Sequence, residues 1–131
     1  MIKSFKMLII FFSTFILSNI ANADLIEIMD SQEGVVYYDN KTISKKNNLI
    51  TFTGVIDLWE VKNNALSWKF RCMTDCNKNL IKYLTFQTFS DNMSEGKLIE
   101  DLKINNWQNV NSLKGSVVHK IVLFICDKYN D

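Results

Sequence analysis

The stretch Leu66–Ser90, "LSWKFRCMTDCNKNLIKYLTFQTFS", contains the clearest structural signal in the chain. Its first part alternates apolar with mostly polar residues, which is the two-residue period of a β-strand, and places Cys72 on one face with Trp68 and Phe70. The connection "DCNKN" favours a hairpin. The second part is apolar on both faces, as in a central strand. One face holds Ile81, Tyr83 and Thr85, and the other holds Lys82, Leu84 and Phe86.

Further strand signals lie on both sides of this predicted hairpin. Residues 35–38, "VVYY", are β-branched and aromatic and run into a turn signal at Asp39-Asn40. Residues 49–61 are rich in strand-forming residues and end at the turn "KNNA". Weaker signals indicate a short strand around residues 98–102 and another near Trp107.

The segment "GSVVHKIVLFICDKY", residues 115–129, has two interpretations. Ser116 could cap a helix, because Val118, Ile121, Val122 and Ile125 recur at helical spacing. The β-branched content favours a last strand instead. Periodicity alone does not decide between them, so the expected fold class is α+β or mostly β.

The N-terminal segment, residues 1–23, has the pattern of a cleaved signal peptide. Lys3 and Lys6 precede an apolar run that ends at the small residues Ala21-Asn22-Ala23. A membrane span needs about 20 apolar residues, whereas this run is broken by Ser18 and Asn19. We therefore expect export and cleavage after Ala23. No cysteine follows that site to carry a lipid anchor, so we expect no stable membrane attachment after cleavage.

The remaining residues, 24–131, are predicted to form one domain, because no linker or repeat divides them. Losing the two lysines of the leader takes the formal net charge from +1 to −1. A nearly neutral domain offers no electrostatic basis for binding nucleic acid. An exported chain also enters an oxidising compartment, in which a disulfide persists and helps a small core.

Catalytic and metal-binding chemistry is weakly supported by the sequence. A Cys–His pair would combine Cys72 or Cys76 with His119, the only histidine, but no orienting motif surrounds them. Those three residues with Cys126 could form a zinc site, although a disulfide is the commoner fate after export. No glycine-rich phosphate loop is present. We expect a non-enzymatic protein with no metal and no cofactor.

Two surface features are candidates for contact with a partner. The segment "KTISKK" holds Lys41, Lys45 and Lys46, which could touch an acidic partner or form an ordinary solvated turn. Trp107, in the polar setting "NNWQN", could be partly exposed and bind a protein, or could be structural.

Four pieces of the chain, taken in order, are similar to the bacterial surface-adhesin protein E family. They are "YYDNKTISKKNN", "DCNKNLIKYLTFQTFSDNMSEGK", the tryptophan of "NNWQNV", and "GSVVHKIVLFICDKY", and together they span residues 35–129. The resemblance implies an antiparallel sheet of about six strands with a C-terminal helix packed on it. It thereby favours the helical interpretation of the last segment.

The same resemblance implies roles for the cysteines. Cys76 and Cys126 match the two halves of a family disulfide, which would join the helix to the sheet. Cys72 has no counterpart in the family pattern and is expected to be a free thiol, buried if the alternation is correct.

The resemblance finally implies a function. Family members are adhesins that attach to host extracellular-matrix proteins and associate as dimers through their sheets, so a homodimer is allowed here. Characterised members are lipid-anchored, and the lack of a lipidation cysteine favours a periplasmic or released protein instead. The alternative function is a periplasmic inhibitor or immunity protein that binds a toxin or an enzyme.

Overall fold

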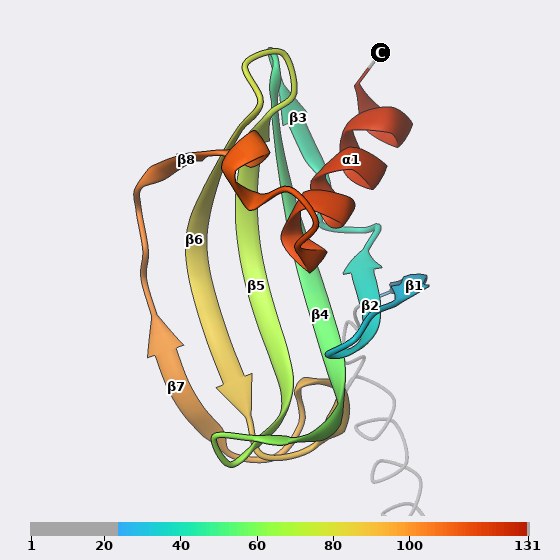
Figure 1. Cartoon of the computed structure of the whole chain (residues 1–131), viewed down its shortest axis with the longest axis vertical. Coiled ribbons are helices and arrows are strands. Elements are labelled where there is room, and N and C mark those ends of the chain that lie inside the picture. The colour runs from blue at the N-terminus through green and yellow to red at the C-terminus, as the bar shows by residue number, and fades with distance from the viewer. Residues whose placement is uncertain (1–23, 131) are drawn as a thin grey trace, which may run out of the picture.

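A computed structural model of the chain describes residues 24–130, so the predicted signal peptide at residues 1–23 lies outside the described part. Within it, eight antiparallel strands form one sheet, and one α-helix packs across a face of that sheet (Figure 1). The elements are β1 Leu25–Asp30, β2 Gly34–Asp39, β3 Ser44–Lys46, β4 Leu49–Lys62, β5 Ala65–Asp75, β6 Leu80–Phe89, β7 Leu98–Leu102, β8 Trp107–Asn109 and α1 Val117–Tyr129, with short 3-10 turns at Asn92–Ser94 and Val110–Leu113.

The sheet order confirms the expected fold class and extends it. The main path is β1-β2-β4-β5-β6-β7, while β3 pairs with β4 and β8 pairs with β6, so the described chain has more strands than the six expected. Two of the strands, β1 and β3, were not predicted. The three residues of β3 are all exposed, and so short a polar strand has no hydrophobic alternation to reveal it.

The predicted hairpin is confirmed as β5 and β6, and β4 precedes them as a 14-residue strand. Asn63 and Asn64 adopt positive φ angles of 49° and 66° in the tight turn between β4 and β5, a conformation that asparagine tolerates well. After β5, the Asp75 carboxylate accepts hydrogen bonds from the backbone N–H groups of Asn77 and Lys78. Side-chain capping of this kind explains why "DCNKN" forms a turn.

A bulge in β6 makes the observed alternation of side chains differ from the predicted one. Arg71 pairs with Thr85, but the next residue of β5, Cys72, pairs with Tyr83. Leu84 is therefore an extra residue, and the side-chain pattern shifts by one position beyond it. The prediction that Phe86 faces away from Tyr83 was wrong, because both border the space between the sheet and α1.

The last segment is a helix, as the resemblance implied. The Ser116 hydroxyl accepts a hydrogen bond from the His119 backbone N–H at 3.2 Å and caps α1. The helix buries Ile121, Val122 and Ile125 against the sheet. This apolar stripe meets a complementary sheet face, so tertiary packing outweighs the strand preference of its β-branched residues. The sheet side of this core includes Val36, Tyr38, Ile50, Phe52, Ile56, Leu58, Phe70, Cys72 and Ile81.

The loop between β6 and β7 covers part of the opposite face. The buried Ser67 hydroxyl donates to the Asp91 carbonyl at 2.6 Å and accepts from the Ser94 N–H at 2.8 Å. The Asp57 carboxylate accepts from the Met93 N–H at 2.9 Å. These contacts hold the loop against β4 and β5.

Across residues 24–130, no helix is long and apolar enough to span a membrane.

Candidate functional site

The disulfide joins Cys76, in the turn after β5, to Cys126, in the last turn of α1. The two Cα atoms lie 5.7 Å apart and the residues are 50 positions apart in sequence. This pairing, implied by the resemblance, is confirmed. It fixes the C-terminal part of the helix to one end of the central hairpin, and its role is structural.

Cys72 is a free cysteine at the centre of the core. It is fully buried on β5, opposite Phe52 of β4. Burial raises the pKa of its thiol well above the ordinary value, so the thiol stays protonated. A buried, protonated thiol is a poor nucleophile. In residues 24–130, no three His, Cys, Asp or Glu side chains are grouped as a metal site would require.

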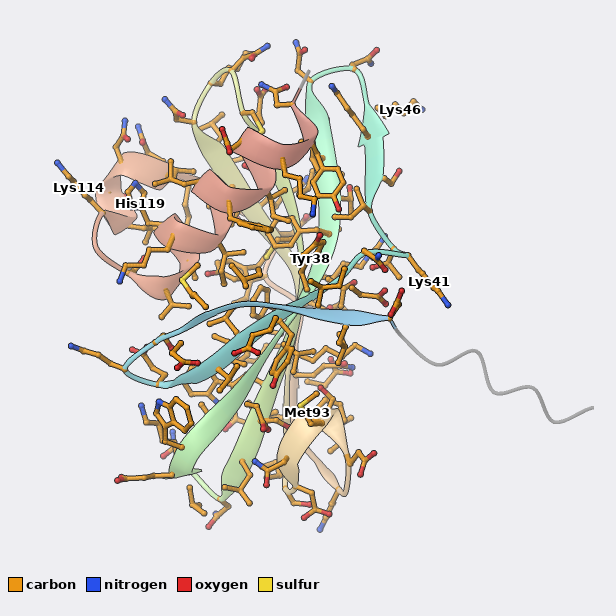
Figure 2. The ribbon with its side chains drawn as sticks, turned by 90° about the vertical axis from the view of Figure 1, so that its right-hand side faces the viewer. Tyr38, Lys41, Lys46, Met93, Lys114 and His119 are labelled. Atoms are coloured by element: carbon orange, nitrogen blue, oxygen red, sulfur yellow. A yellow bond between two sulfur atoms is a disulfide. The ribbon has the colours of Figure 1, made fainter. Side chains whose placement is uncertain are left out.

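The residues predicted to contact a partner lie on opposite edges of the sheet. Lys45 is on β3 opposite Ile50 of β4, and Trp107 is on β8 opposite Lys82 of β6. Strands β4, β5 and β6 separate them, which corresponds to about 19 Å at the usual strand spacing. Lys41 and Lys46 point outward on the β3 side (Figure 2). The structure therefore separates the three lysines from Trp107.

Trp107 lies on an exposed edge of the sheet. Its side chain is 42% exposed, and the Lys82 ammonium lies 4.8 Å from the ring centroid, within the range of a cation–π contact. Leu98 and Leu102 of β7, which pairs with the other end of β6, are also exposed. Both strands follow the same outer side of β6 (Figure 1), and we call this surface, Leu98, Leu102 and Trp107, the β7–β8 edge.

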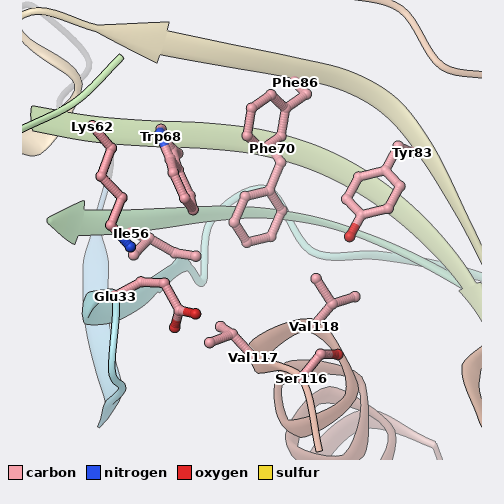
Figure 3. Close-up of a pocket in the computed structure, with 10 residues that line it drawn as sticks. All are labelled: Glu33, Ile56, Lys62, Trp68, Phe70, Tyr83, Phe86, Ser116, Val117 and Val118. Atoms are coloured by element: carbon pink, nitrogen blue, oxygen red, sulfur yellow. The ribbon is translucent and has the colours of Figure 1, made fainter. Parts of the chain in front are cut away.

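A cavity of about 290 Å³ opens between the first turn of α1 and the sheet (Figure 3). We call it the helix pocket. Val117 and Val118 form its helix side, together with Ser116. Its sheet side is apolar or aromatic and comprises Ile56, Trp68, Phe70, Tyr83 and Phe86.

Charged groups mark one end of the helix pocket and a phenol marks the other. Glu33, in the β1–β2 turn, and Lys62, at the end of β4, lie at the same end (Figure 3). The Lys62 ammonium is 5.8 Å from the Trp68 ring centroid. Tyr83 lies at the other end with its hydroxyl directed toward the helix. Burial, and secondarily the neighbouring Cys72, raise the pKa of Tyr83, so its hydroxyl stays protonated.

Sequence reasoning did not find the helix pocket. Trp68 and Phe70 were predicted as core residues, and Phe86 was predicted on the wrong face. The signal was absent because the pocket forms where a bulged strand, a turn and a helix terminus meet, and these segments are far apart in sequence.

Comparison with known proteins identifies the family. The sequence model of surface-adhesin protein E matches residues 25–127, almost the whole described domain. The chain belongs to the surface-adhesin protein E family. Crystal form II of Haemophilus influenzae protein E has a TM-score of 0.61 and 13% identity, covering 86% of this chain and 94% of that one. Protein E from non-typeable Haemophilus influenzae has a TM-score of 0.58 and 14% identity, covering 86% and 81%.

These similarities establish the protein E fold for this chain, since identity so low carries the architecture alone. No curated protein matches the sequence.

Proposed function

We propose that this chain is an exported, non-enzymatic adhesin that binds host extracellular-matrix proteins. The observation that carries the proposal is the match of the surface-adhesin protein E family to residues 25–127. The buried, protonated state of Cys72 is consistent with a protein that binds rather than reacts. With the leader removed, the chain would be periplasmic, released or held at the cell surface.

The β7–β8 edge is the surface best suited to a protein ligand. Tryptophan is prominent among residues that dominate binding energy at interfaces. Here Trp107 is exposed at one end of this edge, opposite Lys82 of β6, and Leu102 and Leu98 are exposed further along it, opposite Phe86 and Phe89. Across residues 24–130, β7 pairs only with β6, so its outer backbone groups are available to an additional strand.

Lys41, Lys45 and Lys46 support a second, separate contact. They lie around β3 on the opposite edge, so one partner would have to span the sheet to touch both surfaces. We assign these lysines to an acidic region of the matrix ligand, where their contribution would decrease as salt concentration rises.

Binding to an immobilised panel of collagen, fibronectin and laminin tests the proposal, using a chain that starts at residue 24. We expect saturable binding to at least one matrix protein, weakened by Trp107→Ala and by Leu102→Ala. Leu123→Ala is the matched control, because Leu123 is also an exposed leucine but lies on α1. Absence of binding to the whole panel, or equal loss in all three variants, would contradict the proposal.

Surface location is tested separately with protease on intact cells that express the full chain. Digestion before lysis is expected for a displayed adhesin. Full protection in intact cells, with digestion after lysis, would place the protein in the periplasm and contradict display at the surface.

A further inference from the structure

The helix pocket has the size and lining of a site for one aromatic ring system. Its volume of about 290 Å³ is roughly twice that of an apolar protein cavity that takes up benzene. Aliphatic and aromatic side chains line it from both the sheet and the helix, with few polar groups. This composition is typical of ligand pockets, in which apolar walls give affinity and sparse polar groups give orientation.

Two smaller, more polar hollows adjoin the helix pocket. One shares Ser116 and Val117 with it and extends past Lys120 of α1. The other shares Lys62 with it and extends past Trp59 near the end of β4. All three depressions are bordered by Glu33 in the β1–β2 turn. The helix pocket is therefore flanked by polar surface beside α1 and beside the end of β4.

We propose that this surface binds a short segment of a protein partner, with one aromatic side chain in the helix pocket and the adjacent main chain in the two hollows. The Glu33 carboxylate can accept from a main-chain N–H, and the Lys62 ammonium can donate to a main-chain carbonyl. Opposite charges at one end complement a neutral, dipolar peptide rather than an ion. The polar hollows also extend beyond what a free ring compound would occupy.

Tyr83 makes tryptophan the preferred anchor. Its hydroxyl lies at the end away from Glu33 and Lys62 and is directed toward the helix (Figure 3). Within residues 24–130 this hydroxyl has no hydrogen-bond partner. A phenol oxygen can accept the N–H of an indole, which phenylalanine lacks. The inference rests on the proposed function, because it specifies how an adhesin would hold a protein ligand.

The test is a titration of the chain from residue 24 with the peptide acetyl-Gly-Ser-Trp-Ser-Gly-amide, followed by backbone amide NMR shifts. Saturable shifts are expected at residues 116–118 and at Tyr83 and Phe86. The same peptide with alanine in place of tryptophan should bind about tenfold or more weakly, because the burial of one aromatic ring is lost. Shifts confined to other regions, or equal binding of both peptides, would overturn the inference.

A variant in which a tryptophan side chain fills the helix pocket tests the same inference, with a matched control on the exposed face of α1. Val117→Trp places an indole where the ligand ring is expected and should abolish peptide binding. Leu123→Trp adds the same side chain to an exposed position of α1 and should leave binding unchanged. Full binding by Val117→Trp would overturn the inference. If that variant does not fold, the shift map of the unsubstituted chain remains decisive.

The test of the helix pocket and the matrix-binding test of the adhesin proposal can fail independently. Matrix binding that is unaffected by Val117→Trp would preserve the adhesin proposal and overturn the helix pocket as its anchor site. Conversely, a chain that binds no matrix protein contradicts the adhesin proposal, while the peptide titration still tests the pocket.

Discussion

At the scale of single residues, the absence of a side chain at Gly54 shapes the core. Gly54 of β4 pairs with Phe70 of β5, and a Cβ atom added at Gly54 would overlap the Phe70 ring. The ring is itself buried and packs edge-on against Phe52, with centroids 6.5 Å apart. It therefore lies over the backbone of β4, in space that only glycine leaves open.

Gly54→Ala should consequently destabilise the fold by overpacking, by about 1–3 kcal/mol. Urea unfolding followed by tryptophan fluorescence would measure the change in the free energy of unfolding. The double variant with Phe70→Leu should show favourable coupling, because the smaller side chain relieves the overlap. Strictly additive effects of the two substitutions would contradict this explanation.

Tyr129, at the end of α1, is coupled to Tyr38 of β2. Their hydroxyl oxygens are 3.0 Å apart. Partial burial, and secondarily this hydrogen bond, raise the pKa of Tyr129 to about 12. A phenol with a raised pKa in the folded state contributes stability below its unfolded pKa of about 10, and that contribution is lost as the pH rises from there through about 12.

Tyr38→Phe should therefore lower the pKa of Tyr129, though not fully to its ordinary value because burial remains. A spectrophotometric phenolate titration of the two proteins measures the shift. Tyr129→Phe identifies the titration step that belongs to Tyr129. An unchanged Tyr129 titration in Tyr38→Phe would show that the hydrogen bond has no influence on its ionisation.

At the scale of elements, the disulfide fixes α1 to the hairpin. Serine replacements at Cys76 and Cys126 together should lower the free energy of unfolding by about 2–5 kcal/mol, because the unfolded chain is no longer constrained. Denaturant titration with and without a reducing agent measures the effect. Reduction should destabilise the unsubstituted chain and leave the serine variant unchanged. A Cys72→Ala variant that lost its sensitivity to reduction would contradict the assigned pairing.

Element identity was only partly readable from the sequence. The β5–β6 hairpin was predicted because alternation and turn chemistry are local properties of the chain. The periodicity of Val118, Ile121, Val122 and Ile125 allowed a strand as well as a helix. The resemblance favoured the helix, and packing against the sheet stabilises it. The bulge at Leu84 was not predictable, because it exists only in the register between β5 and β6.

At the scale of the whole molecule, protection of backbone amides against hydrogen exchange should be greatest at the centre of the sheet and lowest at its edges. β4 and β5 pair along most of their lengths, whereas β3 pairs over three residues. Hydrogen exchange monitored by mass spectrometry should therefore show late exchange in β4 and β5 and early exchange in β3 and β7. Protection of β7 equal to that of β5 at low protein concentration would contradict this order.

The homodimer remains a prediction at this same scale. Sedimentation of the chain over a range of concentrations would detect it, and pairing through β7 should slow exchange in that strand as the dimer forms. A monomer at every concentration tested would contradict the prediction.

The sequence by itself determined the hairpin, its turns and most of the strand segments, because two-residue alternation and asparagine-rich turns act between near neighbours. It also indicated which residues could meet a partner, but not where they would lie. The tertiary structure alone decided that Trp107 and the three lysines occupy opposite edges, that Phe86 turns toward the helix, and that Trp68, Tyr83 and Val117 enclose a pocket. These features depend on strand order, register and the docking of α1, which join segments too distant for any local pattern to specify.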